Sequence, residues 1–224
     1  MSRLLFLEMV LTCQAILFDL DGVLVDSTLA VERVWRKWAL AHNVDPEYVV
    51  ESAHGRRSIE TVRAVAPHLD ADQENLKVEN MEINDKEGII AIPGAQELLS
   101  SLPPERFTIV TSATAALASA RLGYAGLRMP ERLVTADDVT EGKPSPEPYL
   151  KGAAMLGFAP ADCVVFEDTP AGVRSGRAAG MRVIALKTTY PAIELASADA
   201  VLDSFAGVNA RFINGSLCLD LPAT

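Results

Sequence analysis

Ala15-Ile16-Leu17-Phe18-Asp19-Leu20-Asp21-Gly22-Val23-Leu24-Val25-Asp26-Ser27 joins a short apolar run to two aspartates and a glycine turn. The first four residues have the length and composition of a buried strand, and Gly22 marks the turn after it. In a strand, side chains at i and i+2 face the same side, so Asp19 and Asp21 are expected on one side of the chain. Two carboxylates so placed repel each other unless a cation, a proton or a reacting phosphate separates them, which indicates a chemical site.

Length and composition are typical of a soluble globular protein. The 224 residues, 49% hydrophobic and 22% charged, suffice for one sizeable core and a smaller accessory domain. A net charge of -10 argues against a nucleic-acid partner, because phosphate backbones need a basic face. A phosphorylated substrate would therefore have to be neutralised locally.

The cysteines and the N-terminal residues indicate where in the cell the protein is expected. Cys13, Cys163 and Cys218 are widely spaced without a CxxC pair, which favours reduced thiols and a cytoplasmic location. Residues 1–13 form an N-terminal extension, expected to be disordered or to extend a strand. It could be taken for a signal peptide, but Glu8 interrupts its apolar stretch and Arg3 is its only positive charge. No apolar run reaches the roughly 18 to 20 residues that span a bilayer, so no membrane partner is expected.

Apolar strand candidates alternate with helical stretches, which predicts an α/β fold with a Rossmann-like parallel sheet. The strands are expected at residues 15–18, 107–111, 133–135, 163–166 and 183–186. The helices are expected at residues 94–102, 113–122, 146–156 and 171–179. A β-hairpin with a type I′ turn is expected at Asn214-Gly215.

Residues 28–90 interrupt this alternation. They show only helical periodicity, which predicts an inserted helical domain, with residues 14–27 and 91–224 as the catalytic core. Trp35 and Trp38 are three residues apart and should lie on one helical face. We interpret them as the core of the insert rather than as substrate contacts.

Four groups of polar residues lie at the ends of predicted strands or in a loop stiffened by prolines. They are Asp19 with Asp21, Thr111-Ser112, Lys143 ahead of a helix, and Glu167-Asp168. In an open α/β sheet the ligand crevice lies at the carboxyl ends of the strands, where these groups would meet. Together they predict a metal and phosphate site.

Each group also has a purely structural interpretation. The Asp-x-Asp pair could serve a turn or a helix cap, and Ser112 could cap the following helix. Lys143 could be a solvated loop charge, and Glu167-Asp168 could cap a helix beginning near Pro170. Four such coincidences in order are improbable, so the chemical interpretation is preferred.

The order and spacing of these motifs resemble the haloacid dehalogenase-like hydrolase superfamily, in its branch with a helical cap between the first two motifs. The resemblance covers about residues 14 to 205. It implies a Rossmann-like core, a mobile cap and a magnesium-dependent reaction on phosphate esters.

By this resemblance, Asp19 is the nucleophile that becomes an aspartyl-phosphate, and Asp21 is the general acid and base. Ser112 and the backbone at Ala113 would bind the phosphoryl oxygens, and Lys143 would neutralise the nucleophile and the phosphoryl group. The implied Mg²⁺ ligands are the Asp19 side chain, the Asp21 backbone carbonyl, Asp168 and, directly or through water, Glu167.

The second aspartate narrows the reaction. Family members that remove halide lack an acid there, and the ion-pumping ATPases carry threonine, so Asp21 points to phosphate ester turnover. Substrate choice in this branch is attributed to the cap, where His54 and Arg56 in Ser52-Ala53-His54-Gly55-Arg56-Arg57-Ser58 are candidate substrate contacts. The alternative for both is a solvated loop between helices.

Within the superfamily, the chain most resembles bacterial hexitol and hexose phosphatases. The supporting segments include 31–35, 92–95, 109–112 and 164–172, whereas the extension and the terminal hairpin fit less well. A phosphatase of small phosphorylated sugars or polyols, acting as a monomer or small homo-oligomer, is the leading hypothesis. A β-phosphoglucomutase-like isomerase shares all four motifs, and a catalytically silent sugar-phosphate-binding protein is the third possibility.

Overall fold

The computed structural model describes residues 9–222. Its strands are β1 (Met9–Cys13), β2 (Ala15–Phe18), β3 (Val25–Asp26), β4 (Ile90–Ala91), β5 (Phe107–Val110), β6 (Leu133–Val134), β7 (Cys163–Glu167), β8 (Arg182–Leu186), β9 (Ala200–Leu202), β10 (Asn209–Ile213) and β11 (Ser216–Leu221). Its α-helices are α1 (Thr28–Ala41), α2 (Pro46–Ala53), α3 (Ser58–Val65), α4 (Ala71–Asn84), α5 (Ala95–Ser101), α6 (Ala115–Tyr124), α7 (Glu147–Leu156) and α8 (Pro170–Ala178). Short 3₁₀ turns lie at Pro104–Arg106, Ala136–Asp138 and Pro160–Asp162.

A six-stranded parallel sheet forms the centre of the molecule, in the order β6-β5-β2-β7-β8-β9. Every residue of β2, β5 and β7 is buried, as continuous apolar runs in a sheet covered on both faces require. In register, Phe18 lies opposite Ile109 on one side and Phe166 on the other, so β2, β5 and β7 end together. The predicted α/β fold with a Rossmann-like parallel sheet is confirmed.

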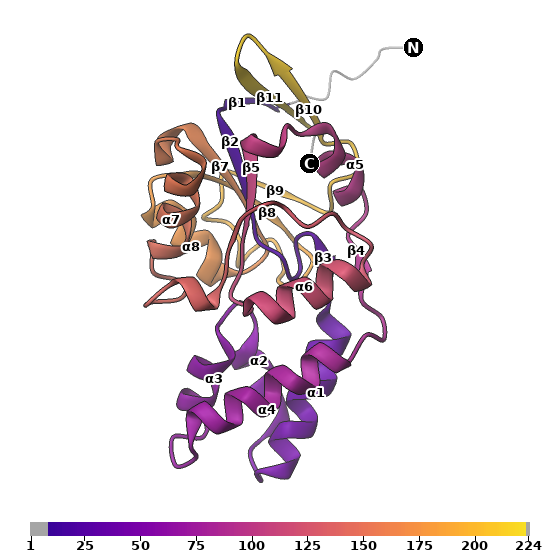
Figure 1. Cartoon of the computed structure of the whole chain (residues 1–224), viewed down its shortest axis with the longest axis vertical. Helices are drawn as coiled ribbons and strands as arrows, with labels where there is room; N and C mark the ends of the chain where they lie inside the picture. The colour runs from indigo at the N-terminus through magenta and orange to yellow at the C-terminus, as the bar shows by residue number, and fades with distance from the viewer. Residues whose placement is uncertain (1–8, 223–224) are drawn as a thin grey trace.

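Helices cover both faces of this sheet (Figure 1). On one face, Ile16 and Phe18 pack in a cluster that includes residues of α5 and α6. On the other, Leu17 packs in a cluster that includes residues of α7 and α8. Alternate residues of β2 thus enter opposite layers, as a strand's two-residue period dictates.

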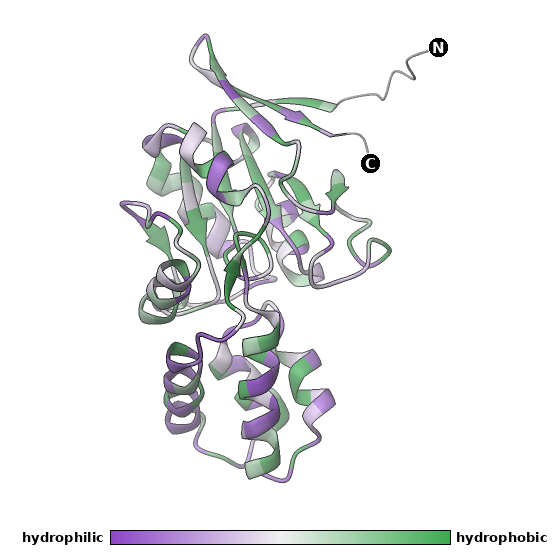
Figure 2. Cartoon of the chain, turned by 90° about the vertical axis from the view of Figure 1, so that its right-hand side faces the viewer, coloured by the Kyte–Doolittle hydropathy of each residue, from purple (hydrophilic) through white to green (hydrophobic). Residues whose placement is uncertain are grey.

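Helices α1 to α4 form a separate helical unit beyond the carboxyl ends of β2 and β5 (Figure 1). Its own core holds both tryptophans together with Val49, Val62 and Val78, and the tryptophan rings meet edge to face at 5.6 Å. The strands of the central sheet are mainly hydrophobic, whereas helices of this unit alternate hydrophobic and hydrophilic residues, as one-sided burial requires (Figure 2). The pair β3–β4 lies where the chain leaves for the unit and returns.

The two ends of the described chain form a second, three-stranded sheet in the order β1-β11-β10. Asn214 and Gly215 both have positive φ, 51° and 84°, as the expected type I′ turn of the β10–β11 hairpin requires. Leu217, Leu219 and Leu221 are buried against the main core. Residues 9–13 of the extension therefore form a strand, and residues 1–8 lie outside the described residues.

The structure of the described residues also bears on the state of the cysteines and on membrane-spanning helices. All three cysteines are free thiols, with Cys13 and Cys163 buried. Between residues 9 and 222, the chain contains no helix with the length and apolar character needed to cross a membrane.

Candidate active site

The four predicted groups of polar residues meet at the carboxyl ends of β2, β5 and β7, which are neighbours in the sheet. Asp19 follows β2, Ser112 follows β5, and Glu167 ends β7 with Asp168 directly after it. Lys143 comes from the loop that precedes α7. Parallel strands bring these segments to one edge, which is where open α/β sheets bind ligands.

Asp19 is held as an extension of β2. Its backbone N–H donates to the carbonyl of Phe166 at 2.9 Å, and its Oδ1 accepts from the N–H of Leu20 at 2.7 Å. Its Oδ2 lies 3.0 Å from Lys143 Nζ, and the side chain is 6% exposed. Burial raises the pKa of Asp19 to about 7, although Lys143 opposes the rise.

Lys143 lies beneath this carboxylate rather than in solvent. Its Nζ is 2.6 Å from Glu167 Oε1, donates to the carbonyl of Val110 at 3.2 Å, and lies 5.1 Å from the Tyr149 ring centroid. Burial alone would lower the pKa of Lys143, but Asp19 and Glu167 outweigh burial and hold it above its ordinary value. With 1% of the side chain exposed, a solvated loop charge is ruled out.

Glu167 accepts hydrogen bonds with both of its carboxylate oxygens and thereby fixes the position of Lys143. Its Oε1 accepts from Lys143 and from the Tyr149 hydroxyl at 2.7 Å. Its Oε2 accepts from the N–H groups of Asp168 at 2.9 Å and Thr169 at 3.2 Å. Burial would raise the pKa of Glu167, yet Lys143 and these donors keep it below its ordinary range. Thr169 and not the acidic pair caps α8, since its side chain accepts from the Gly172 N–H.

Asp168 has fewer hydrogen-bond partners than Glu167. Its Oδ1 is buried and accepts no hydrogen bond from any residue between 9 and 222. Burial, then Glu167 and Asp19, raise the pKa of Asp168 well above its ordinary value. Carboxylate oxygens of Asp19, Glu167 and Asp168 lie within 4.8 Å of one another. Three buried carboxylates facing one ammonium, with one oxygen unpartnered, fit a divalent cation of the oxygen-preferring kind.

Asp21 is separated from these three carboxylates. Its Oδ1 accepts from the Ser27 hydroxyl at 2.6 Å, and its Oδ2 forms an ion pair with Nη1 of Arg121. Both aspartates nevertheless line one cavity. The two acids therefore share a site without sharing partners, which gives them different chemistry.

The predicted phosphate-binding residues Ser112 and Ala113, which follow β5, form hydrogen bonds with other groups of the protein. Ser112 Oγ donates to the carbonyl of Gly55, in the loop between α2 and α3, at 3.2 Å. The Ala113 N–H donates to Thr111 Oγ1 at 3.0 Å. Thr114 and not Ser112 caps α6, so the capping interpretation of Ser112 is wrong.

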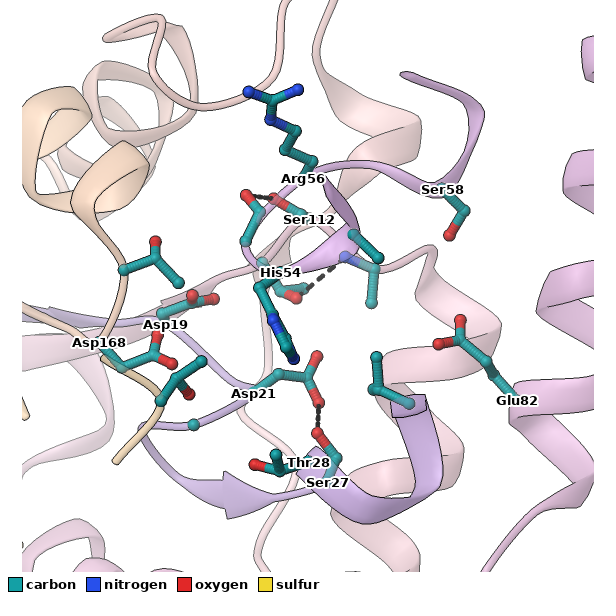
Figure 3. Close-up of a pocket in the computed structure, with 18 of the residues that line it drawn as sticks. Asp19, Asp21, Ser27, Thr28, His54, Arg56, Ser58, Glu82, Ser112 and Asp168 are labelled. Carbon is teal, nitrogen blue, oxygen red and sulfur yellow. Dashed lines mark hydrogen bonds between the residues drawn. The ribbon is translucent and has the colours of Figure 1, made fainter. Parts of the chain in front are cut away.

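His54 and Arg56, the predicted substrate contacts from the helical unit, point in different directions. His54 projects into the cavity toward Asp21 (Figure 3), and its Nε2 is buried without a hydrogen-bond partner among residues 9–222. Burial lowers the pKa of His54. Arg56 lies at the rim, and its guanidinium points away from the carboxylates (Figure 3).

Three further candidate functional residues carry no signal that predicts them from the sequence. Arg121 and Glu82 line the cavity from α6 and α4, and Tyr149 of α7 holds Glu167. In the sequence, Arg121 and Glu82 look like ordinary helix-surface charges, and no local signal marks their burial. Asp168, His54 and Arg121 each carry an unpartnered buried polar atom, and all three line this one cavity. Such atoms are costly unless a ligand or water satisfies them, so their gathering marks the cavity as a binding site.

Comparisons with known proteins identify the family of this chain. Over 197 residues the chain is 47% identical to hexitol phosphatase A of Escherichia coli, covering 86% of this chain and 91% of that protein. It is 37% identical to glycerol-1-phosphate phosphohydrolase 2 of Saccharomyces cerevisiae, covering 80% and 77%. A hydrolase crystal structure from Pseudomonas syringae superposes with a TM-score of 0.77 at 26% identity, covering 85% and 93%. Residues 13–180 match the haloacid dehalogenase-like hydrolase family, and the chain therefore belongs to that family.

Proposed function

We propose that this protein is a magnesium-dependent phosphatase that hydrolyses small sugar or sugar-alcohol phosphates through an aspartyl-phosphate on Asp19. The observation that carries the proposal is the placement of Asp19, 3.0 Å from the buried Lys143 ammonium and within the three-carboxylate cluster. Asp21 lines the same cavity with its carboxylate held separately.

Asp19, Asp21 and Lys143 have separate roles in the proposed reaction. An Asp19 oxygen attacks phosphorus, and the phosphorus–oxygen bond of the ester breaks while Asp21 gives its proton to the leaving oxygen. The Asp21 carboxylate then takes a proton from the water that attacks the phosphoryl group, which frees Asp19 and releases phosphate. Lys143 balances charge throughout.

The phosphoryl oxygens need donors that the substrate-free site uses elsewhere. Ser112 Oγ would turn from the Gly55 carbonyl toward a phosphoryl oxygen, with the Ala113 N–H beside it. Bound Mg²⁺ would supply positive charge between the carboxylates and the phosphoryl group. Asp19, Asp168, the Asp21 carbonyl and, directly or through water, Glu167 would hold it.

The cavity wall supports a hydroxylated substrate. Thr28, His54 and Ser58 offer hydrogen-bonding groups, while Val31 and Trp35 add apolar surface. A mixed wall of this kind suits a polyol, whose carbon chain and hydroxyls need both. The similarity to hexitol and glycerol-1-phosphate phosphatases supports the same class. We also propose that residues 28–90 act as the cap that closes over the substrate in this cavity.

A mutase remains the second candidate, and the charges of the cavity disfavour it. A sugar-bisphosphate primer needs a cation for its second phosphate. Among the described residues that line the cavity, the arginines are Arg56 and Arg121. Arg121 is already paired with Asp21 and Glu82, and Arg56 points away from the carboxylates. Among the described residues that line the cavity, Arg56 at the rim is thus the one arginine left for a second phosphate, whereas a monophosphate needs none. A silent binding protein is disfavoured because Asp19, Asp21, Lys143 and Asp168 are all in place.

The test is a panel of phosphate esters assayed with magnesium and with a chelator. We expect release of inorganic phosphate from hexitol, hexose and glycerol monophosphates only with magnesium, and no activity from Asp19→Asn. Hexose bisphosphates and nucleotides serve as comparison substrates and should be poor. Strict dependence on a bisphosphate primer would favour the mutase instead, and inertness across the panel would favour the silent binding protein.

A further inference from the structure

Arg121 is a buried cation at the centre of a three-residue chain of charges. Its Nη1 pairs with Asp21 Oδ2, and its Nη2 lies 3.2 Å from Glu82 Oε1. The side chains of Arg121 and Glu82 are each 5% exposed. Arg121 belongs to α6 on the sheet, and Glu82 belongs to the last turn of α4 in the helical unit.

The cost of burying these charges makes the arrangement informative. A guanidinium taken out of water costs several kcal/mol unless carboxylates and hydrogen bonds replace the solvent. An apolar residue at either position would fill the same contact without that cost. The pair therefore has a role beyond joining α4 to α6, and the role must involve Asp21, the one group of the proposed reaction that Arg121 touches.

The contacts of Asp21 show what that role is. Ser27 holds one carboxylate oxygen and Arg121 holds the other, so rotation of the carboxylate is restrained from two sides. Glu82 restrains the guanidinium in turn, and Arg121 Nε has no hydrogen-bond partner among residues 9–222. Asp21 is thus oriented by a core helix whose arginine is itself anchored by the helical unit.

We propose that Arg121 is a positioning residue for Asp21, with Glu82 as the counter-ion that anchors it from the helical unit. The proposal rests on the proposed function, because it concerns proton transfer by Asp21. It implies that Asp21 is correctly oriented only while α4 is docked on α6. Arg121 takes no part in bond making or breaking.

A second contact on the same helix pair provides a matched control. The Tyr124 hydroxyl donates to the carbonyl of Ile83 at 2.8 Å, beside Glu82 in α4 and three residues from Arg121 in α6. It joins the same two helices but does not contact Asp21. Tyr124→Phe therefore reports on docking of the helical unit alone.

The choice of ester separates positioning from general structural damage. A p-nitrophenolate leaving group departs without a proton, whereas an alkoxide such as that of glycerol phosphate needs one. Loss of Asp21 positioning should spare the first turnover of p-nitrophenyl phosphate but slow the release of phosphate from Asp19. Rapid mixing would then show a burst of about one equivalent of nitrophenolate per enzyme, followed by a slow phase.

The experiment compares Arg121→Met, Arg121→Lys, Glu82→Gln and Tyr124→Phe in the full chain with magnesium at pH 8, where Glu82, whose pKa burial raises to about 7, is ionised. We expect Arg121→Met to lower kcat on glycerol phosphate by about 100-fold, the scale of an ångström-sized misplacement. Its KM for glycerol phosphate should be unchanged, and with p-nitrophenyl phosphate it should show the nitrophenolate burst. Arg121→Lys should recover part of the rate. Glu82→Gln should lower kcat on glycerol phosphate by about tenfold, because it acts on Asp21 only through Arg121. Tyr124→Phe should behave as the wild type.

Circular dichroism and thermal melting show which variants are folded, and Glu82→Gln and Arg121→Lys carry the test should Arg121→Met unfold. An active wild type whose folded Arg121 and Glu82 variants keep full kcat, or slow both phases of p-nitrophenyl phosphate turnover equally, would overturn the positioning role only. A wild type that hydrolyses neither ester with magnesium would overturn the proposed function, and with it this inference.

Discussion

At the scale of single residues, Asp19 and Asp21 are only two positions apart, yet the fold gives them separate partners. Asp19 faces Lys143, and Asp21 faces Ser27 and Arg121. The Asp-x-Asp pattern predicts the shared cavity, because both side chains leave the end of one strand. It does not reveal the division of partners, since Arg121 follows Asp21 by 100 residues.

Asp19→Asn tests the nucleophile directly. The amide has nearly the same shape but is a poor nucleophile, so kcat should fall by roughly 10⁴-fold or more. Burial raises the pKa of Asp19 to about 7, so its ionised form is disfavoured and the uncharged amide should leave the magnesium-free melting temperature unchanged or higher. Phosphate release and thermal melting are measured on the same preparation. Substantial residual turnover would remove Asp19 from this role.

Gly22→Ala tests the metal site through the backbone. A Cβ at Gly22 would lie 1.9 Å from Asp168 Oδ2, so Asp168 must move. We expect the magnesium concentration for half-maximal activity to rise about 10- to 100-fold. The magnesium-induced rise in melting temperature, which needs no turnover, should shrink in parallel.

Gly88→Ala is the control for backbone strain. Gly88 has φ of 79°, close to the 75° of Gly22, and a Cβ there meets nothing within 4 Å. Both substitutions should cost about 1–2 kcal/mol of stability through φ, but only Gly22→Ala should alter the magnesium requirement. Equal magnesium requirements in the two variants would contradict the placement of Asp168 as a ligand.

At the scale of elements, the alternation of apolar runs predicts five of the six strands of the main sheet to within a residue at each end. The missed strand, β9, has three residues and lacks room for a pattern. Helix α6 begins at Ala115 rather than 113 because Thr114 caps it. Pairing between distant segments has no local signal, so β1 and β11, at opposite ends of the chain, are not predicted as partners.

Gly152→Ala tests the packing of α7 on the sheet. A Cβ there would lie 2.7 Å from Leu17 Cδ2 and 2.8 Å from Val110 Cγ2, which are buried. Overpacking of this kind costs about 1–3 kcal/mol, more than the gain in helix propensity of just under 1 kcal/mol. The variant should therefore unfold at lower urea concentration. Activity should fall too, since α7 carries Tyr149, which holds Glu167.

Gly123→Ala in α6 is the matched helical control. A Cβ at Gly123 meets nothing within 4 Å, so only the helix propensity changes. Stability should rise by about 0.5–1 kcal/mol with activity unchanged. A Gly152→Ala variant that is stabilised to the same extent would show that α7 can shift without cost.

At the scale of the whole molecule, the site is completed where the helical unit meets the sheet. The sequence motifs locate the core-side groups that follow a recognisable strand or lie in the stiff loop before α7, but they do not locate Tyr149 within α7. They do not locate the Glu82–Arg121 pair. Its burial arises only when α4 packs on α6, and a lone Arg near the end of a helix ordinarily serves the helix dipole.

The burial of Glu82 at this junction predicts a pH-dependent stability. Burial raises the pKa of Glu82 from 4.5 to about 7, against the lowering by Arg121 and with Asp21 and Glu79 adding to the rise. Below pH 4.5 Glu82 is protonated in both states. Between 4.5 and 7 the folded state keeps a proton that the unfolded chain has released, so the free energy of unfolding falls as the pH rises. Above pH 7 the loss is complete, at about 3 kcal/mol.

Glu82→Gln removes this titration while keeping the shape of the side chain. The free energy of unfolding of the wild type minus that of the variant should therefore decrease by about 3 kcal/mol between pH 4.5 and 8. Urea denaturation at several pH values, in chelator so that no metal binds, measures it. The other carboxylates contribute to both proteins and largely cancel in the difference. Parallel pH curves for the two proteins would mean that Glu82 is solvated, and that the helical unit does not press it against Arg121 in solution.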